Sequence, residues 1–170
     1  MQNIKFNSLI DKGFSAIEMM VVLAVLVILA TIAIPSSLHK IIKEQIITSI
    51  PLADIAKAPV AFAWATEKTM VKDNVQAGLP SPDKVVNNFI SAVEIQDGAI
   101  HITFGNKAHK NIKDKVLTLR PAVIEESQIV PVAWVCGNAS APTNMTIRGV
   151  NKTNVHPEFL SNGCRDITAK

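Results

Sequence analysis

The chain has 170 residues, of which 48% are hydrophobic, and its formal net charge is +3. This length is enough for one domain with its own core plus an appendage. Such a small positive surplus does not by itself indicate a nucleic-acid-binding protein, which needs a clustered basic face. The aromatic content of 5%, with no tyrosine, also argues against a stacking platform for single-stranded nucleic acids.

Most of the apolar excess lies in one run near the N-terminus. Residues 1–13 are polar and mildly basic, and Lys5 and Lys12 precede the run, which predicts a cytoplasmic N-terminus by the positive-inside rule. From Phe14 to Ile34 the run spans about 21 residues, or ~30 Å as a helix, which matches one hydrocarbon core. The sequence therefore predicts a membrane-spanning helix.

Two simpler interpretations of this run are a plain membrane anchor and a secretory signal peptide. Thr31-Ile32-Ala33 could serve as the cleavage site of a signal peptide. However, the run is longer than the apolar core of a signal peptide, and Glu18 at its upstream edge has no purpose in a discarded segment. The acid therefore favours a retained helix with a specific role.

Helical periodicity continues beyond the apolar run. The apolar positions step by three or four residues, which predicts an amphipathic helix and, with the preceding run, one helix from about 14 to 68. Pro35, Pro51 and Pro59 should each bend or locally open it, and the alternative is two or three separate helices. The predicted buried stripe comprises Leu38, Ile42, Ile46, Ile50, Ala53, Ala56, Val60 and Ala63.

Short alternating runs follow a turn-rich linker at 69–91. Residues 93–95 and 99–104 flank Gln96-Asp97-Gly98, which predicts a hairpin with Asp-Gly at the turn. Residues 116–119 predict a third strand, ended by Pro121, and residues 132–136 a fourth. The predicted fold class is α+β, with a long N-terminal helix packed on a four-stranded antiparallel meander.

The two cysteines, Cys136 and Cys164, both lie near the C-terminus. In a chain with a membrane-targeting start, such a pair predicts one disulfide formed outside the cytoplasm. The alternative is two unrelated buried thiols.

These features together carry a family resemblance. Gly13-Phe14-Ser15-Ala16-Ile17-Glu18, followed by the apolar run to Ile34-Pro35, resembles the N-terminus of a type IV prepilin. The strands and Cys164-Arg165 are similar to the head of type IVa pilins. The resemblance implies a leader at 1–13, a transmembrane and assembly helix at 14–38, and a globular head at 39–170. Within the head it implies an amphipathic helix at 39–68, a linker at 69–91, a sheet at 92–136 and a disulfide loop at 136–164.

The resemblance also implies a life cycle. A prepilin peptidase would cut between Gly13 and Phe14 and methylate the new Phe14 amine. The precursor would wait in the bacterial inner membrane until the pilus assembly machinery extracts it into an extracellular, helical homopolymer. Glu18 and Pro35 are the predicted assembly residues. Because an unpaired carboxylate in hydrocarbon is costly, Glu18 should pair with the Phe14 amine of its own or an adjacent subunit. Alternatively, Glu18 merely lies at the headgroup level.

Residues 106–120 form the densest basic stretch. A possible anionic-ligand patch there would bind DNA or a host surface, and the alternative is a solvated loop whose charge keeps a fibre soluble. The patch comprises Lys107, Lys110, Lys113, Lys115 and Arg120.

The predicted function is a structural subunit of a type IV pilus, used for adhesion, twitching motility or DNA uptake. The alternatives are a minor pilin that acts as a DNA receptor, a type II secretion pseudopilin and a plain membrane-anchored periplasmic protein. The sequence contains no P-loop, no Gly-x-Ser-x-Gly elbow and no Cys-x-x-Cys, so we expect neither an enzyme nor a cofactor.

Overall fold

The computed structural model describes residues 13 and 15–166, with the backbone alone for 32–37. The predicted leader, apart from Gly13, and the predicted methylation site Phe14 lie outside the described residues. The chain divides into two compact units, Met1–Leu38 and His39–Lys170. We call the first the N-terminal unit and the second the head.

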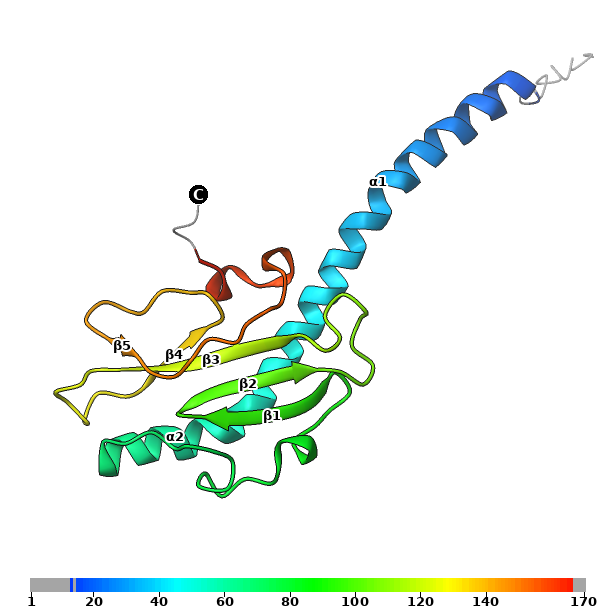
Figure 1. Cartoon of the computed structure of the whole chain (residues 1–170). Coiled ribbons are helices and arrows are strands. Elements are labelled where there is room, and N and C mark those ends of the chain that lie inside the picture. Colours follow the sequence, from blue (N-terminus) through cyan, green and yellow to red (C-terminus); the bar gives the residue numbers. More distant parts are fainter. Residues whose placement is uncertain (1–12, 14, 167–170) are drawn as a thin grey trace, which may run out of the picture. The chain divides into compact units, whose positions relative to one another are not determined.

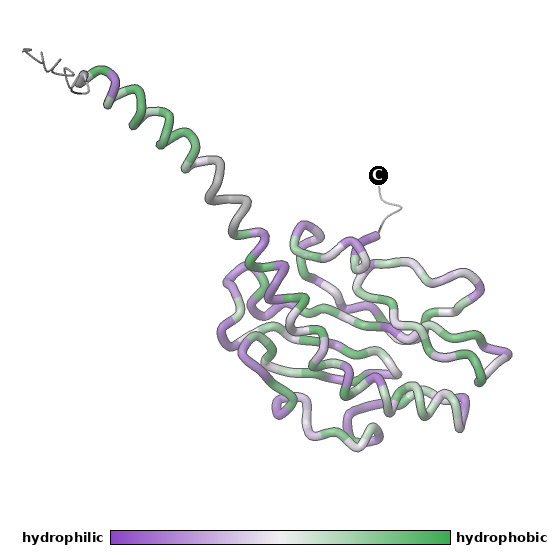
Figure 2. The backbone as a smooth tube through the Cα atoms, turned by 180° about the vertical axis from the view of Figure 1, so that it is seen from behind, coloured by the Kyte–Doolittle hydropathy of each residue, from purple (hydrophilic) through white to green (hydrophobic). Residues whose placement is uncertain are grey.

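The described part of the N-terminal unit is an apolar helix whose side chains are not covered by any other described residue. Helix α1 (Ala16–Ser49) begins here, and every side chain from Ser15 to Thr31 is exposed. Ile17 and Met20, for example, are 69% and 72% exposed. Figure 2 shows this stretch as almost continuously hydrophobic. Because so much apolar surface is unfavourable in water, the helix needs lipid or other protein chains around it.

The helical path runs from Ala16 to Glu67 but is not a single α-helix. A 3₁₀ turn, η1 (Ile50–Ala53), separates α1 from α2 (Asp54–Glu67). The predicted local opening at Pro51 is therefore confirmed, and it divides the predicted single helix into two α-helices, because proline lacks the N–H that an α-helix needs to bond the carbonyl four residues back. Pro35 and Pro59 do not open the helix locally, because the backbone stays α-helical at both.

One face of this helical path forms half of the head core. The predicted stripe is confirmed at its centre, whereas Leu38 is exposed and Ile50 and Ala63 are half-buried. By length and composition the stretch Leu38–Glu67 could cross a membrane, but its buried face identifies it as a core helix of the head. The buried residues of this face are Ile42, Ile46, Ser49, Ala53, Ala56, Val60 and Trp64.

The sheet forms the other half of the core (Figure 1). Its strands follow the order β1-β2-β3-β4, all antiparallel, which confirms the predicted meander and the α+β fold class. A short fifth strand, which the sequence did not predict, pairs with β3. The bounds are β1 Ile90–Gln96, β2 Ala99–Phe104, β3 Val116–Val123, β4 Ala133–Cys136 and β5 Thr146–Ile147.

The hairpin prediction is confirmed by the backbone between β1 and β2. Asp97 and Gly98 have φ values of 49° and 81°, the combination that a two-residue type I′ turn requires. The turn is also attached to the linker, because the Gly98 N–H donates to the Val71 carbonyl at 2.7 Å.

Strand β3 does not end at Pro121 as predicted. Pro121 pairs in register with Trp134 of β4, and the strand continues to Val123. The Pro121 carbonyl accepts from the Arg148 N–H at 2.8 Å. This bond lies on the edge of β3 that faces β2, beyond Leu119, the last β3 residue that pairs with β2. The missing proline N–H would point to that same side, so its loss breaks no bond to β2 or β4.

The linker at 69–91 contains little regular structure and is held by one buried side chain. The Asn74 amide nitrogen donates to the Pro80 carbonyl at 3.0 Å and to the Val93 carbonyl at 2.9 Å. Its amide oxygen accepts from the Ile95 N–H at 2.7 Å. Asn74 thus joins two parts of the linker to each other and joins the linker to strand β1.

The Cys136–Cys164 disulfide is confirmed, and it closes a loop with a sequence separation of 28. Gly137 follows it with φ 55°, and a side chain there would come within 2.6 Å of the Cys164 carbonyl oxygen. Glycine is therefore required at this close approach. The loop is also bound to β3, where Thr118 Oγ1 accepts from the Lys152 N–H at 3.0 Å.

Candidate functional site

The start of α1 is organised by the predicted assembly residue Glu18. The Ser15 N–H donates to Glu18 Oε2 at 2.9 Å. Ser-x-x-Glu is the spacing of a capping box, in which the acid satisfies a backbone N–H at the helix start. The negative carboxylate also lies at the positive end of the helix dipole. Sequence reasoning missed this local role, although the spacing of Ser15 and Glu18 could have revealed it.

The predicted pairing of Glu18 with the Phe14 amine remains a prediction, because Phe14 lies outside the described residues. The observed bond nevertheless restricts where the carboxylate can be. It places one carboxylate oxygen 2.9 Å from the Ser15 N–H, one residue along the chain from the amine that the prediction invokes.

Two further features surround the helix start. A Cβ atom added at Gly13 would meet no described atom within 4 Å. Glu18 borders an open hollow of about 290 Å³, which it shares with Ile17, Val21 and Val22. The carboxylate therefore lies beside exposed apolar side chains that another helix could contact.

The four lysines of the predicted basic patch lie in the connection between β2 and β3. We call residues 105–115 the basic loop. All four ammonium groups are exposed, and no acidic group among the described residues lies within 4.0 Å of any of them. They belong to Lys107, Lys110, Lys113 and Lys115.

Arg120, the fifth residue of the predicted patch, lies apart from these lysines on strand β3. Its side chain is half-buried, and Nη2 donates to the Gly137 carbonyl at 2.9 Å. Burial lowers the pKa of its guanidinium. Arg120 lies on β3, which leads away from the basic loop, and it supports the backbone beside the disulfide.

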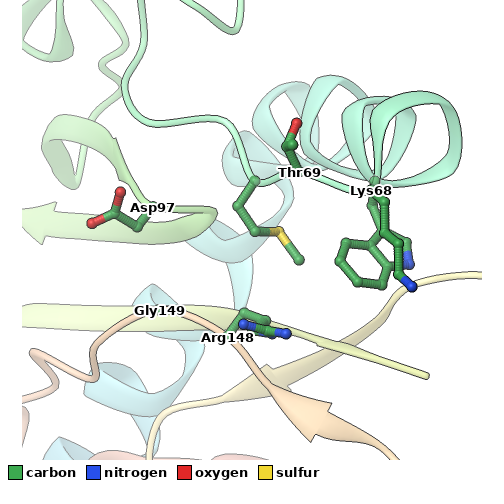
Figure 3. A pocket seen from close by; sticks show the side chains of 7 residues that line it. Lys68, Thr69, Asp97, Arg148 and Gly149 are labelled. Atoms are coloured by element: carbon green, nitrogen blue, oxygen red, sulfur yellow. The ribbon is translucent and has the colours of Figure 1, made fainter. Parts of the chain in front are cut away.

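A separate pocket of about 370 Å³ lies where the end of α2, the β1–β2 turn and the chain after β5 meet (Figure 3). Lys68, Asp97 and Arg148 contribute charged groups to its rim, and all three residues are exposed. Arg148 is already paired with Glu125 at 2.7 Å. The pocket is a surface hollow rather than an enclosed site.

One histidine is buried in the sheet. His101 on β2 is 2% exposed, and its Nδ1 lies 3.0 Å from Thr118 Oγ1 on β3. Burial lowers the pKa of His101, the charge of Lys152 lowers it further, and Glu94 acts in the opposite direction. The net effect favours the neutral imidazole in the folded head.

This histidine should make the head less stable in acid. Between the pKa of His101 in the folded head and its pKa in the unfolded chain, the unfolded chain binds more protons. The stability that neutral His101 contributes is therefore fully present above the unfolded pKa of about 6.5 and declines as pH falls below it. The slope should reach at most ~1.4 kcal/mol per pH unit. Urea unfolding of the full chain, followed by Trp64 and Trp134 fluorescence between pH 7 and 5, measures this decline.

His101→Gln is the matched variant, because a glutamine can still hydrogen-bond to Thr118 but does not titrate. We expect a shallower decline of stability in the variant. An equal decline in both proteins would assign the acid sensitivity to other groups.

The described residues thus combine an exposed apolar helix, which needs lipid or other protein chains around it, with a small, disulfide-closed α+β head. Comparison with known proteins identifies the family: the sequence model of the pilin family, described as Pilin (bacterial filament), matches residues 44–165. The chain therefore belongs to the pilin family, whose members are subunits of bacterial filaments.

Individual relatives cover nearly the whole chain. It is 28% identical to a type IV major pilin protein PilE of Neisseria gonorrhoeae, over 92% of this chain and 95% of the relative. It is 26% identical to a fimbrial protein of Neisseria meningitidis, over 94% and 97%. It is 28% identical to fimbrial protein Q of Moraxella bovis, over 92% and 98%.

Proposed function

We propose that the chain is a structural subunit of a type IV pilus, made as a membrane-anchored precursor and assembled through α1 into an extracellular filament. The observation that carries the proposal is the exposed apolar helix with Glu18 at its start, in a chain whose head belongs to the pilin family. Such a filament serves adhesion, twitching motility or DNA uptake. The chain itself supplies packing and charge, and no catalytic step.

The first proposed step is cleavage between Gly13 and Phe14 by a prepilin peptidase, followed by methylation of the Phe14 amine. Gly13 has no side chain to obstruct the protease. Cleavage leaves the Ser15 amide intact, so its bond to Glu18 persists in the mature chain, where the new amine is one residue away in sequence. The helix start is thus prepared for the new charge.

The second proposed step is extraction from the membrane by the assembly machinery. In a filament the apolar helices would pack together in a core without lipid, where an unpaired charge costs several kcal/mol. Glu18 of one subunit would accept the Phe14 amine of a neighbour, which fixes the axial register. The apolar side chains from Met19 onward would supply the packing energy. Pro35, whose backbone is α-helical, is the second proposed assembly residue.

The mass of the N-terminal peptide tests this proposal. It should be measured for protein from sheared surface filaments and from membranes. We expect a methylated peptide that begins at Phe14 and is abundant in the filaments. An intact Met1, or cleavage near Ala33, would contradict the proposal.

A Gly13→Ile variant provides the matched control for processing. The added side chain should obstruct the peptidase, so the membrane protein keeps its leader and filaments disappear. Normal processing of this variant would show that the peptidase does not act at this bond.

A further inference from the structure

The basic loop lies at the end of the head where the chain joins the N-terminal unit. The His109 N–H donates to Gln45 Oε1 of α1 at 2.9 Å. Gln45 is only about 9 Å along the helix from His39, the first residue of the head. In Figure 1 the β2–β3 connection runs beside this part of α1. The loop therefore lies near the start of the head in space, while the β1–β2 turn lies at the other end of strand β2.

The fold of the loop is fixed, so its lysines are held in place rather than carried on a free tether. Ala108 and Ile112 are buried and anchor the loop to the core. The Lys113 N–H donates to the His109 carbonyl at 3.0 Å, and the Phe104 N–H donates to the Lys115 carbonyl at 2.9 Å. A bound partner would not have to order this backbone, which lowers the entropic cost of binding.

The charge of the loop is not neutralised within the described head. Four exposed lysines stand against one aspartate, Asp114, and none of the four ammonium groups has an acidic neighbour within 4.0 Å among residues 15–166. Lys40 on α1 adds another exposed cation next to the junction. An anionic partner that contacts the loop would therefore meet lysines that have no acidic neighbour among the described residues.

We propose that the basic loop binds the anionic headgroups of the bilayer that holds the precursor. The inference rests on the proposed function, because it requires α1 to be anchored in a membrane. A lysine beside an anionic lipid surface contributes about a fivefold gain in association. Its long apolar stem also allows the ammonium group to reach the phosphates while the head stays in water.

Lipid is favoured over nucleic acid by location. Anchorage of the N-terminal unit tethers the start of the head to the bilayer, so headgroups are present at a high effective concentration near the loop, which contacts Gln45. The loop has no arginine for bidentate contacts to phosphates or base edges, and it has no phenylalanine, tyrosine or tryptophan on which bases could stack. DNA is therefore the competing outcome of the test.

The test uses the full chain inserted into vesicles of two compositions. One contains only phosphatidylcholine, and the other contains roughly one third phosphatidylglycerol, which gives an anionic surface. An amine-reactive reagent is added, and labelling is measured by mass spectrometry for each lysine. We expect labelling of the four loop lysines to be about fivefold slower in the anionic vesicles, with recovery at ~1 M salt, where the Debye length is about 3 Å.

Lys68 and Lys72 are internal controls, because both are exposed and lie near the opposite end of the head. Their labelling should not depend on the vesicle composition. A Lys110→Gln/Lys113→Gln variant should lose the protection at the two remaining loop lysines. The charge-matched Lys68→Gln/Lys72→Gln variant should keep it.

The outcomes separate this inference from the proposed function. A chain that floats with both kinds of vesicle but shows equal labelling overturns the inference and leaves the anchoring intact. Stronger protection by duplex DNA than by anionic lipid overturns it in favour of a nucleic-acid surface. A chain that does not float overturns the anchoring and this inference together.

Discussion

Glu18→Ala and Glu18→Gln should both reduce surface filaments by roughly a hundredfold, although the processed protein still accumulates in the membrane. Without the carboxylate, the Phe14 amine of each incoming subunit would enter the helix core unpaired, at a cost of several kcal/mol. The yield of sheared filaments measures the loss. The N-terminal peptide mass from membranes shows that processing is unchanged.

The two substitutions distinguish charge pairing from helix capping. Glutamine can replace glutamate in a capping box, so Glu18→Gln keeps the bond to the Ser15 N–H and loses only the charge. Alanine loses both. If Glu18→Gln assembled normally, the role of the acid would be local capping, and the proposed pairing would be wrong. Glu44→Gln, which neutralises an exposed acid on the same helix, should assemble normally.

Replacing both cysteines by serine should destabilise the head by about 3 to 4 kcal/mol, which is the chain-entropy estimate for a loop of this size. The disulfide also brings the 160–164 segment beside β4, where Gly137 lies against the Cys164 backbone. We expect the melting temperature of the full chain to fall by roughly 10–15 °C. Differential scanning calorimetry in detergent measures the change.

Reduction provides the control for the cysteine variant. A reductant should lower the melting temperature of the wild-type chain to that of Cys136→Ser/Cys164→Ser and should not affect the variant. Equal melting temperatures of the oxidised wild type and the variant would show that the hydrogen bonds of the loop hold the C-terminal segment without the disulfide.

Several parts of the fold could be predicted because local patterns and packing agree. The buried face from Ile42 to Val60 follows the helical period, and the Asp97-Gly98 turn has the one chemistry that a tight hairpin prefers. The disulfide could be predicted from the number of cysteines and from the compartment in which the head is expected to fold. In each case a short-range signal and the tertiary structure point to the same answer.

Other features depend on tertiary context. The rule that proline disrupts regular structure holds at Pro51, which lies in the helical path. It fails at Pro121, because the neighbouring strands do not need the N–H that this proline lacks. Strand β5 has two residues, too few for any alternation to appear. Asn74 bonds to the backbone of Ile95, 21 residues further along the chain, and no local sequence pattern predicts this contact.

The candidate site shows the same division. The position of Glu18 before an apolar run could be recognised in the sequence, and its capping bond could have been recognised too. The basic residues looked like one patch because they are close in sequence. The structure separates Arg120 from the lysines, since a strand carries it to the disulfide loop, and it joins the basic loop to Gln45, 64 residues away from His109.

The most direct test of the central claim is a helical reconstruction of the sheared filaments at a resolution that shows side chains. We predict α1 helices packed in the core, with the Glu18 carboxylate about 3 Å from the Phe14 amine of a neighbouring subunit. Filaments in which α1 lies outside the core, or in which Glu18 faces solvent far from any amine, would contradict it.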